Sequence, residues 1–292
     1  MTRRITLLVN PTAAGGRALR RVPAITAELS RLGASHRTVE TESIEHACAE
    51  ARRAVEADET VAALGGDGFL RPLAGVLAGG PGALAVLPGG RGNDFARVLG
   101  IPVEPAAAAR VAVQGTEKAL DIAEVNGEPY IGIASLGFDS ECNQLANETK
   151  LIRGNLVYLY SALRTLVSWK PATFTVDVDG QHHEITGWSV AVANSKAFGG
   201  GMFLAPHAQL DDGILEVITI AKSSRLAYLR GLPKVFKGTH LENPMVGTLR
   251  GKRVSVSADR PFDVYADGDP VATLPATMSV RRQVLRVIVP AA

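Results

Sequence analysis

The sequence predicts an α/β protein of two domains: an N-terminal doubly wound, mostly parallel α/β domain and a C-terminal β-rich, sandwich-like domain. Over residues 1–125, apolar runs typical of buried strands alternate with helical segments, which is the pattern of a parallel sheet covered by helices. Over residues 126–280, short alternating runs lie between Asp-Gly and Pro turns. A chain of 292 residues with 46% hydrophobic residues can supply two cores. The tail, about 281–292, is a candidate to pack back on the first domain.

The N-terminal elements follow from short β-favouring apolar runs, each followed by a turn and then by a helical segment. Leu7-Leu8-Val9 and Ala83–Leu87 are the clearest such runs, together with the run that ends at Leu64. In chain order we expect strand 5–9, helix 23–32, strand 37–40, helix 44–57, strand 60–64, helix 70–78, strand 83–87, helix 93–99 and helix 105–113.

The C-terminal elements are mainly strands, which we expect at 173–178, 188–193, 215–220, 253–257 and 278–289. Asp179-Gly180 lies between two such runs and predicts a hairpin turn. His182 and His183 beside it do not suggest a metal site, because adjacent strand residues point to opposite faces.

Residues 147–170 show a helical pattern of apolar side chains flanked by basic residues. We prefer a helix packed over the second domain's sheet; the alternative is a lip that covers acyl chains or contacts an anionic bilayer. Residues 233–236 with Lys234 and Lys237 are a weaker candidate of the same kind. The apolar residues of the pattern are Ile152, Leu156, Leu159, Tyr160, Leu163, Leu166 and Val167, flanked by Arg153, Arg164 and Lys170.

Three glycine-rich loops, each directly after a predicted strand, indicate a phosphate site. They are Asn10–Arg17, Gly65–Gly68 and Pro88–Arg97. Glycine allows the backbone to approach a phosphate closely, and loops at the carboxyl ends of parallel strands converge on one crevice. Arg17 and Arg91 supply positive charge, while Asn93 or Asp94 can cap the next helix and expose its amides to an anion. Asp67 would then lie beside a phosphoryl group with a divalent cation or a proton between them.

These motifs resemble the diacylglycerol kinase catalytic-domain family, which includes bacterial lipid kinases and sphingosine kinases and is more distantly related to NAD kinases. The resemblance spans nearly the whole chain and continues through Gly137-Phe138-Asp139, Leu210–Leu215 and Ala266–Pro270. It implies an active site in the cleft between the two domains. It also implies ATP-dependent transfer of the γ-phosphate to a hydroxyl of a lipid such as diacylglycerol, with Mg2+ as cofactor.

The resemblance assigns a role to each matching residue. Asp67 would organise Mg2+ and the γ-phosphate, and Asp269 would accept the hydroxyl proton. Asp212, with the main-chain carbonyls of Gln209 and Ile214, would bind Mg2+, either structurally or for catalysis. The nucleotide would contact Asn10, Arg17, Thr41, Gly65, Gly66, Asp67, Gly68, Gly90, Arg91, Gly92, Asn93 and Asp94.

Three departures from the family pattern leave two alternatives open. Phe69–Pro72 stands where the family commonly has Thr, a hydrophobic residue, Asn and Glu; Arg91 stands where it often has Thr, and Asp269 where it usually has Glu. One alternative is a kinase of a different acceptor, such as NAD. The other is a protein that binds nucleotide and lipid without catalysis.

Amino-acid composition limits which binding partners and which cellular location we expect for this protein. The formal net charge is +2 and the 31 Lys and Arg residues are dispersed, so nucleic acid is not expected. Two cysteines, Cys48 and Cys142, show no disulfide pattern, which favours the cytoplasm. No apolar stretch is long enough to span a bilayer, so we expect peripheral contact with the inner membrane face. The expected partner is a lipid with a free hydroxyl, and a homodimer is possible.

Overall fold

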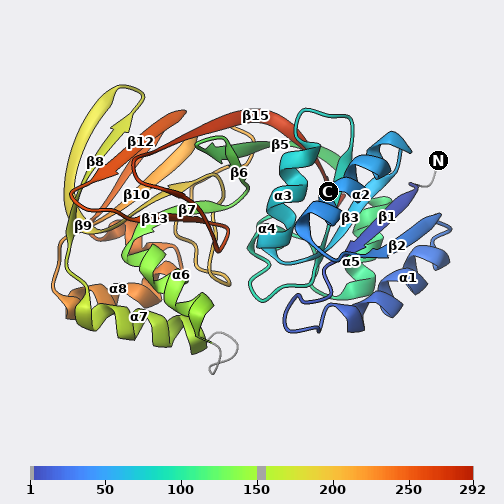
Figure 1. Cartoon of the computed structure of the whole chain (residues 1–292), viewed down its shortest axis with the longest axis horizontal. Helices are drawn as coiled ribbons and strands as arrows, with labels where there is room; N and C mark the ends of the chain where they lie inside the picture. The colour runs from blue at the N-terminus through green and yellow to red at the C-terminus, as the bar shows by residue number, and fades with distance from the viewer. Residues whose placement is uncertain (1–2, 150–155, 292) are drawn as a thin grey trace. The chain divides into compact units, whose positions relative to one another are not determined.

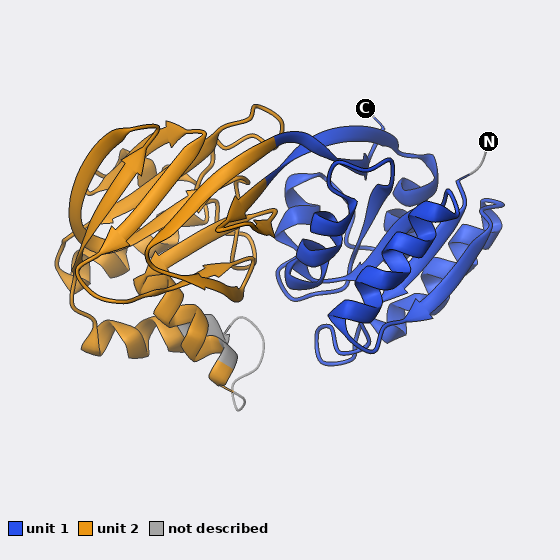
Figure 2. Ribbon diagram, turned by 45° about the horizontal axis from the view of Figure 1, so that its top comes forward, with its two compact units in different colours: residues 1–122, 282–292 blue, residues 123–281 orange. Residues whose placement is uncertain are grey.

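The computed structural model describes residues 3–149 and 156–291. The chain divides into two compact units (Figure 2): unit 1 comprises Met1–Ile122 and Arg282–Ala292, and unit 2 comprises Ala123–Arg281. Two strands run from one unit into the other, β5 (Thr116–Val125) and β15 (Ala276–Val289). The C-terminal tail therefore belongs to unit 1, where β15 pairs in parallel with β4 (Ala83–Pro88).

Unit 1 is a parallel sheet with helices on both faces (Figure 1). The strand order is β2 (His36–Glu40), β1 (Ile5–Val9), β3 (Thr60–Gly65), β4 and the end of β15, with every neighbouring pair parallel. Strands β1 and β4 are buried at every residue, as expected for strands covered on both faces.

The helices of unit 1 pack in two pairs on opposite faces of this sheet (Figure 1). Helix α1 (Val22–Arg31) packs against α5 (Pro105–Gln114), and α2 (Ile44–Glu56) against α3 (Asp67–Leu77). A short α4 (Asp94–Val98) and a 3-10 turn, η1 (Leu19–Arg21), complete the unit. Side-chain caps start two helices, because Ser43 accepts from the His46 N–H and Glu104 from those of Ala106 and Ala107.

The sequence placed the start of α3 three residues too late. The helix begins at Asp67 rather than at Leu70, with Gly66 as the N-cap residue. The N–H groups of Phe69 and Leu70 already donate to the Gly66 carbonyl, so the glycine-rich segment is itself the first helical turn. Glycine has low intrinsic helix propensity, and the tertiary contacts described below override it.

Unit 2 is built from mostly antiparallel strands in the order β14 (Asp269–Thr273), β13 (Asp263–Ala266), β7 (Ile133–Gly137), β9 (Gln181–Ala193), β8 (Ala172–Val178), β12 (Arg253–Ala258) and β15. β10 (Leu215–Ala221) pairs with both β9 and β11 (Val246–Gly251), and β6 (Glu128–Tyr130) pairs with β5. This agrees with the predicted β-rich, sandwich-like domain.

Strand β9 is twice as long as the sequence suggested, because its first half is polar. Its residues 181–186 pair only with β8. Gly187 pairs with Ala172 of β8 and with Ala221 of β10, and residues 189–193 pair with β7 on one side and β10 on the other. The β8–β9 turn at Asp179-Gly180 has positive φ at both residues (50° and 88°), which confirms the predicted hairpin.

Among the described residues of unit 2, three helices cover the sheet: α6 (Phe138–Glu148), α7 (Leu156–Ser168) and α8 (Arg225–Val235), the last followed by η2 (Thr239–Glu242). Beneath them lies an aromatic core in which the Phe138 ring meets those of Trp169, Trp188 and Tyr228 at centroid distances of 4.9–5.7 Å. The single helix suggested by the pattern over 147–170 is therefore two helices; Ile152 and Arg153 lie outside the described residues. No helix in the described ranges is long and apolar enough to cross a membrane.

Candidate functional site

The glycine-rich loops of unit 1 meet at one edge of its sheet. Because β2, β1, β3 and β4 are adjacent and parallel, Asn10, Thr41, Gly66 and Gly89 all lie just beyond their carboxyl ends. The Asn10 N–H donates to the Leu64 carbonyl at 3.0 Å, and the Thr41 hydroxyl donates to the Val9 carbonyl at 3.0 Å. The predicted nucleotide residues of these loops are thus neighbours in space.

The second and third loops touch backbone to backbone. The Gly89 N–H donates to the Gly65 carbonyl at 2.8 Å. A Cβ atom added to Gly90 would lie 2.4 Å from the Cα of Gly66, and one added to Gly66 would lie 3.1 Å from the Cα of Gly90. Glycine is required at Gly90 because of this approach, not because of a turn.

Asp67 fixes the third loop to the second. Its two carboxylate oxygens accept the N–H groups of Asp94 (3.0 Å) and Phe95 (3.1 Å), which form the first turn of α4. The sequence suggested that Asn93 or Asp94 caps this helix. Asn93 instead adopts the left-handed conformation (φ 51°), and its side chain accepts from the Gly90 N–H at 2.7 Å and donates to the Gly90 carbonyl. The cap therefore comes from a residue 27 positions earlier, and it engages two of the amides that were expected to face an anion.

Two carboxylates lie close together at this point. Burial raises the pKa of Asp67, and the negative charge of Asp94 raises it further, although the two accepted main-chain N–H groups oppose both effects. Asp94 is buried, with the Arg97 guanidinium 3.7 Å away. The two side chains offer carboxylate oxygens, which are the donors that Mg2+ prefers, and a divalent cation would offset part of their negative charge.

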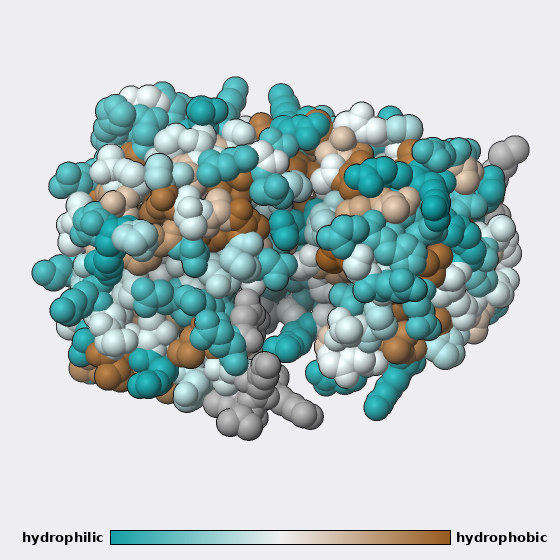
Figure 3. All heavy atoms as spheres, viewed as in Figure 1, coloured by the Kyte–Doolittle hydropathy of each residue, from teal (hydrophilic) through white to brown (hydrophobic). Residues whose placement is uncertain are grey.

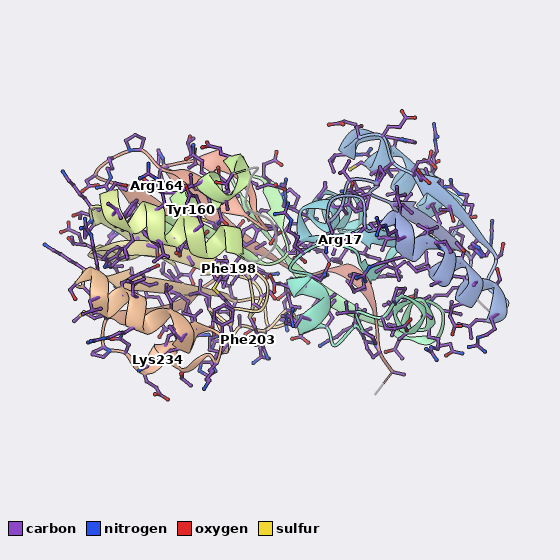
Figure 4. The ribbon with its side chains drawn as sticks, turned by 90° about the horizontal axis from the view of Figure 1, so that it is seen from below. Arg17, Tyr160, Arg164, Phe198, Phe203 and Lys234 are labelled. Carbon is purple, nitrogen blue, oxygen red and sulfur yellow. The ribbon has the colours of Figure 1, made fainter. Side chains whose placement is uncertain are left out.

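Arg17 and Arg91, the two predicted phosphate-binding cations, are both exposed at this edge. Arg17, labelled in Figure 4, donates from Nε to the Ala14 carbonyl at 2.9 Å. Its loop is tightly coiled, since Ala14, Gly15 and Gly16 all have φ between 51° and 84°.

Asp269, the predicted proton acceptor, begins β14 directly after a two-residue turn. Asp267 and Gly268 form this turn with φ of 53° and 93°. The Asp267 carboxylate accepts the N–H groups of Ile131 (2.9 Å) and Gly132 (2.8 Å), which ties the hairpin to the start of β7. Asp269 is half-buried. Asp267 is a positioning residue to which the sequence analysis gave no role, although a carboxylate in an Asp-Gly turn commonly accepts main-chain N–H groups.

Asp212 lies at the same edge of the unit 2 sheet as Asp269. The registers place Ala193 of β9 opposite Ile133 of β7 and Glu216 of β10, while Ala266 of β13 pairs with Ala134. The first residues of β7 and β10 therefore lie beside the last residues of β9 and β13, at this edge of the sheet. The structure thus brings two predicted site residues of unit 2 to one edge.

The predicted metal site at Asp212 does not fit a cation in this arrangement. One carboxylate oxygen of Asp212 accepts the Ile214 N–H, and the other accepts from Arg250 at 2.9 Å. Arg250 also lies 3.4 Å from Glu216, its cross-strand partner, whose carboxylate is largely buried. The single positive charge of Arg250 offsets only part of the charge of the two carboxylates, but its guanidinium occupies one oxygen of Asp212. A dication bound by Asp212 and the carbonyls of Gln209 and Ile214 would have to displace it.

Asp139 is a buried carboxylate that the sequence analysis quoted in a motif without assigning it a role. It lies in the first turn of α6, and the Tyr228 hydroxyl is 3.5 Å from its Oδ1. Burial raises its pKa to about 6, while hydrogen bonds from Ser189 and Tyr228 act in the opposite direction.

Comparison with known proteins agrees with this architecture. Residues 4–125 match the family model "Diacylglycerol kinase catalytic domain", and residues 132–289 match "YegS C-terminal NAD kinase beta sandwich-like domain". The chain is 33% identical over 297 aligned residues to a diacylglycerol kinase of Mycobacterium tuberculosis, covering 98% of this chain and 95% of that protein. The chain belongs to the diacylglycerol kinase family.

Other members of the diacylglycerol kinase family match along their whole length as well. A diacylglycerol kinase of Bacillus subtilis is 27% identical over 297 residues, covering 99% of this chain and 97% of that protein. A crystal structure of a diacylglycerol kinase from Bacillus anthracis has a TM-score of 0.78 and covers 99% of this chain and 97% of that one, at 24% identity. The structural likeness establishes a shared fold, and the sequence matches place the chain in a lipid kinase family.

We expect Gly90→Ala to destabilise unit 1 by more than about 2 kcal/mol, because the new Cβ would collide with the Gly66 backbone. Chemical denaturation measures the change. Gly80→Ala is the matched control, since its Cβ would have 3.5 Å to the nearest atom. Equal stability of the two variants would contradict the proposed loop contact.

The raised pKa of Asp139 predicts a loss of stability as pH rises. Below its ordinary value of 3.8 the group is protonated in both states; above about 6 the folded state carries the full penalty of a buried charge. The cost at neutral pH is at most about 3 kcal/mol. Relative to Asp139→Asn, the wild type should therefore lose unfolding free energy between pH 4 and pH 7, whatever the other carboxylates contribute to both proteins. An unchanged difference would argue that the carboxylate stays hydrated.

Arg250→Met should lower stability by about 1–2 kcal/mol, because Asp212 and the largely buried Glu216 lose their cation while Arg250 itself is half exposed. Mg2+ should restore part of that loss, and EDTA should leave the wild type unaffected. Thermal unfolding with each additive gives the comparison, with the exposed Arg253→Met on β12 as control. A wild type stabilised by Mg2+ as much as the variant would reinstate the predicted cation site.

Proposed function

We propose that this protein transfers the γ-phosphate of ATP to a free hydroxyl of a lipid such as diacylglycerol. The observation that carries the proposal is the set of glycine-rich loops fixed together beyond the carboxyl ends of β1, β3 and β4. Direct backbone contact between Gly66 and Gly90 and the Asp67 bridge to α4 hold these loops in one arrangement. Phosphoryl transfer depends mainly on positioning and electrostatic stabilisation, which a rigid polar edge can supply.

In this proposal unit 1 holds the nucleotide. Main-chain N–H groups of the loops and the exposed guanidinium groups of Arg17 and Arg91 would contact the phosphate oxygens. Asp67 keeps the loops aligned and, with Asp94, would hold Mg2+, whose charge offsets that of the phosphates. The remaining predicted contacts, Asn10 and Thr41, shape the loops through their bonds to the neighbouring strands.

Unit 2 would supply the proton acceptor. The Asp269 carboxylate would take the proton of the acceptor hydroxyl, whose oxygen forms the new bond to the γ-phosphorus as the bond to the ADP oxygen breaks. A carboxylate of ordinary basicity suffices, since in a loose transition state the proton leaves late. Asp267 holds the β13–β14 hairpin, so the shorter side chain of Asp269 starts from a fixed backbone.

Asp269→Asn should reduce kcat by roughly 10²–10⁴-fold, because it removes the proton acceptor. The assay is transfer of labelled γ-phosphate from ATP with Mg2+ to diacylglycerol, a sphingoid base and NAD, each tested separately. Asp263→Asn, an exposed aspartate on the same hairpin, is the matched control. Asp269→Glu should retain activity.

The remaining outcomes of this assay would overturn the proposal. Label in NAD but in no lipid would make the protein a kinase of a different acceptor. Bound ATP with no labelled product would make it a non-catalytic binding protein. Full turnover of Asp269→Asn would remove Asp269 from the mechanism.

A further inference from the structure

The outward face of α7 carries three apolar side chains beside Arg164 and Ser168, whereas two positions on its inward face carry hydroxyl groups. Tyr160, Leu163 and Val167 are spaced three and four residues apart, which puts them on one side of the helix. They are 40%, 46% and 68% exposed, while Ser161 and Thr165 are buried. A surface helix ordinarily turns its apolar side chains inward. Packing on the core of unit 2 therefore does not account for the outer side of α7.

Helix α8 extends the same surface. Figure 4 shows α7 and α8 side by side, with Tyr160 and Arg164 labelled on one and Lys234 on the other. Both helices pack on one core, to which α7 contributes Leu166 and α8 contributes Tyr228. Leu226 in α8 and Phe236 at its end are 56% and 54% exposed. Hydrophobic atoms reach the surface where these helices lie, at the lower left of Figure 3.

The charge of these helices is of one sign. The segments 156–170 and 222–238 contain no acidic residue, although the chain as a whole has 29 against 31 basic ones. The acidic residues on the elements packed against them are Asp139, Glu141 and Glu148 in α6 and Glu242 in η2. The basic residues of the two segments are all exposed: Arg164, Lys170, Lys222, Arg225, Arg230, Lys234 and Lys237. We call this surface the α7–α8 face.

We infer that the α7–α8 face docks on an anionic lipid bilayer, with Leu163, Val167 and Phe236 inserted among the headgroups and the basic side chains against them. Apolar side chains interspersed with basic ones suit an interface that is apolar below and negatively charged above. A second copy of this face is a poor partner, because the two sets of basic residues would repel each other. The inference rests on the proposed function, in which the acceptor is a lipid.

Co-sedimentation with vesicles tests the inference without nucleotide, so the result does not depend on catalysis. The wild type should bind vesicles of phosphatidylcholine mixed with phosphatidylglycerol much more tightly than phosphatidylcholine alone, and high salt should weaken binding. Arg230→Gln with Lys234→Gln should weaken binding roughly 30-fold. Leu163→Ser with Val167→Ser should weaken it about tenfold or more. The matched control, Arg52→Gln with Arg286→Gln in unit 1, removes the same charge from exposed positions and should bind as the wild type does.

Two other patterns of vesicle binding would overturn the inference. Binding that is equal in all variants would place the contact elsewhere. Loss in the charge variant but not in the apolar one would indicate an acidic macromolecule rather than a bilayer. Thermal unfolding checks that the variants are folded, and phosphate transfer to short-chain diacylglycerol in neutral detergent should be unchanged in them. Vesicle binding that responds as expected in a protein without transfer activity would refute the proposed function and leave the docking face intact.

Discussion

The Asp67 carboxylate, which joins two loops of unit 1, is the interaction on which the candidate site depends. It lies in the first turn of α3 and caps α4, so the loops after β3 and β4 cannot move independently. The neighbouring backbones approach so closely that only glycine fits at Gly90. A residue that the sequence suggests for chemistry is thus also a structural tie. The Asp67 side chain can hold the two loops together and still serve as a polar group of the site, because each of its oxygens keeps a free lone pair after accepting one N–H group.

Several carboxylates in the structure are buried or half-buried, and their negative charges are stabilised by different partners. Asp67 and Asp267 accept main-chain N–H groups, Asp212 and Glu216 share Arg250, and Asp139 meets the hydroxyl of Tyr228. Hydrogen bonds from main-chain amides and ion pairs with arginine favour the ionised carboxylate. Burial favours the neutral carboxyl group, and hydroxyl groups offset only part of that effect. Burial raises the pKa of Asp67, Glu216 and Asp139 alike, although main-chain amides oppose it at Asp67, arginine at Glu216 and hydroxyl groups at Asp139, where the pKa rises to about 6.

The two units contribute in different ways to the proposed reaction. Unit 1 offers parallel strand ends and glycine-rich loops, which suit a polyphosphate. Unit 2 brings the Asp212 and Asp269 segments to one edge of its own sheet, and its outer helices form the α7–α8 face. A lipid kinase needs a nucleotide site, a proton acceptor and access to lipid, and the chain has a distinct candidate element for each.

The sequence alone predicted the parallel strands, most helix positions, the Asp179-Gly180 hairpin and the glycine-rich loops. These features are local, because burial pattern, turn chemistry and glycine content act over a few neighbouring residues. Tertiary structure decided which residue caps α4, that Arg250 pairs with Asp212, that β9 is long and that α7 turns apolar side chains outward. The two side-chain pairings join groups that lie far apart in the sequence, 27 residues for Asp67 and Asp94 and 38 for Asp212 and Arg250. Local patterns cannot encode such pairings, because their energies arise only when the folded chain brings the partners together.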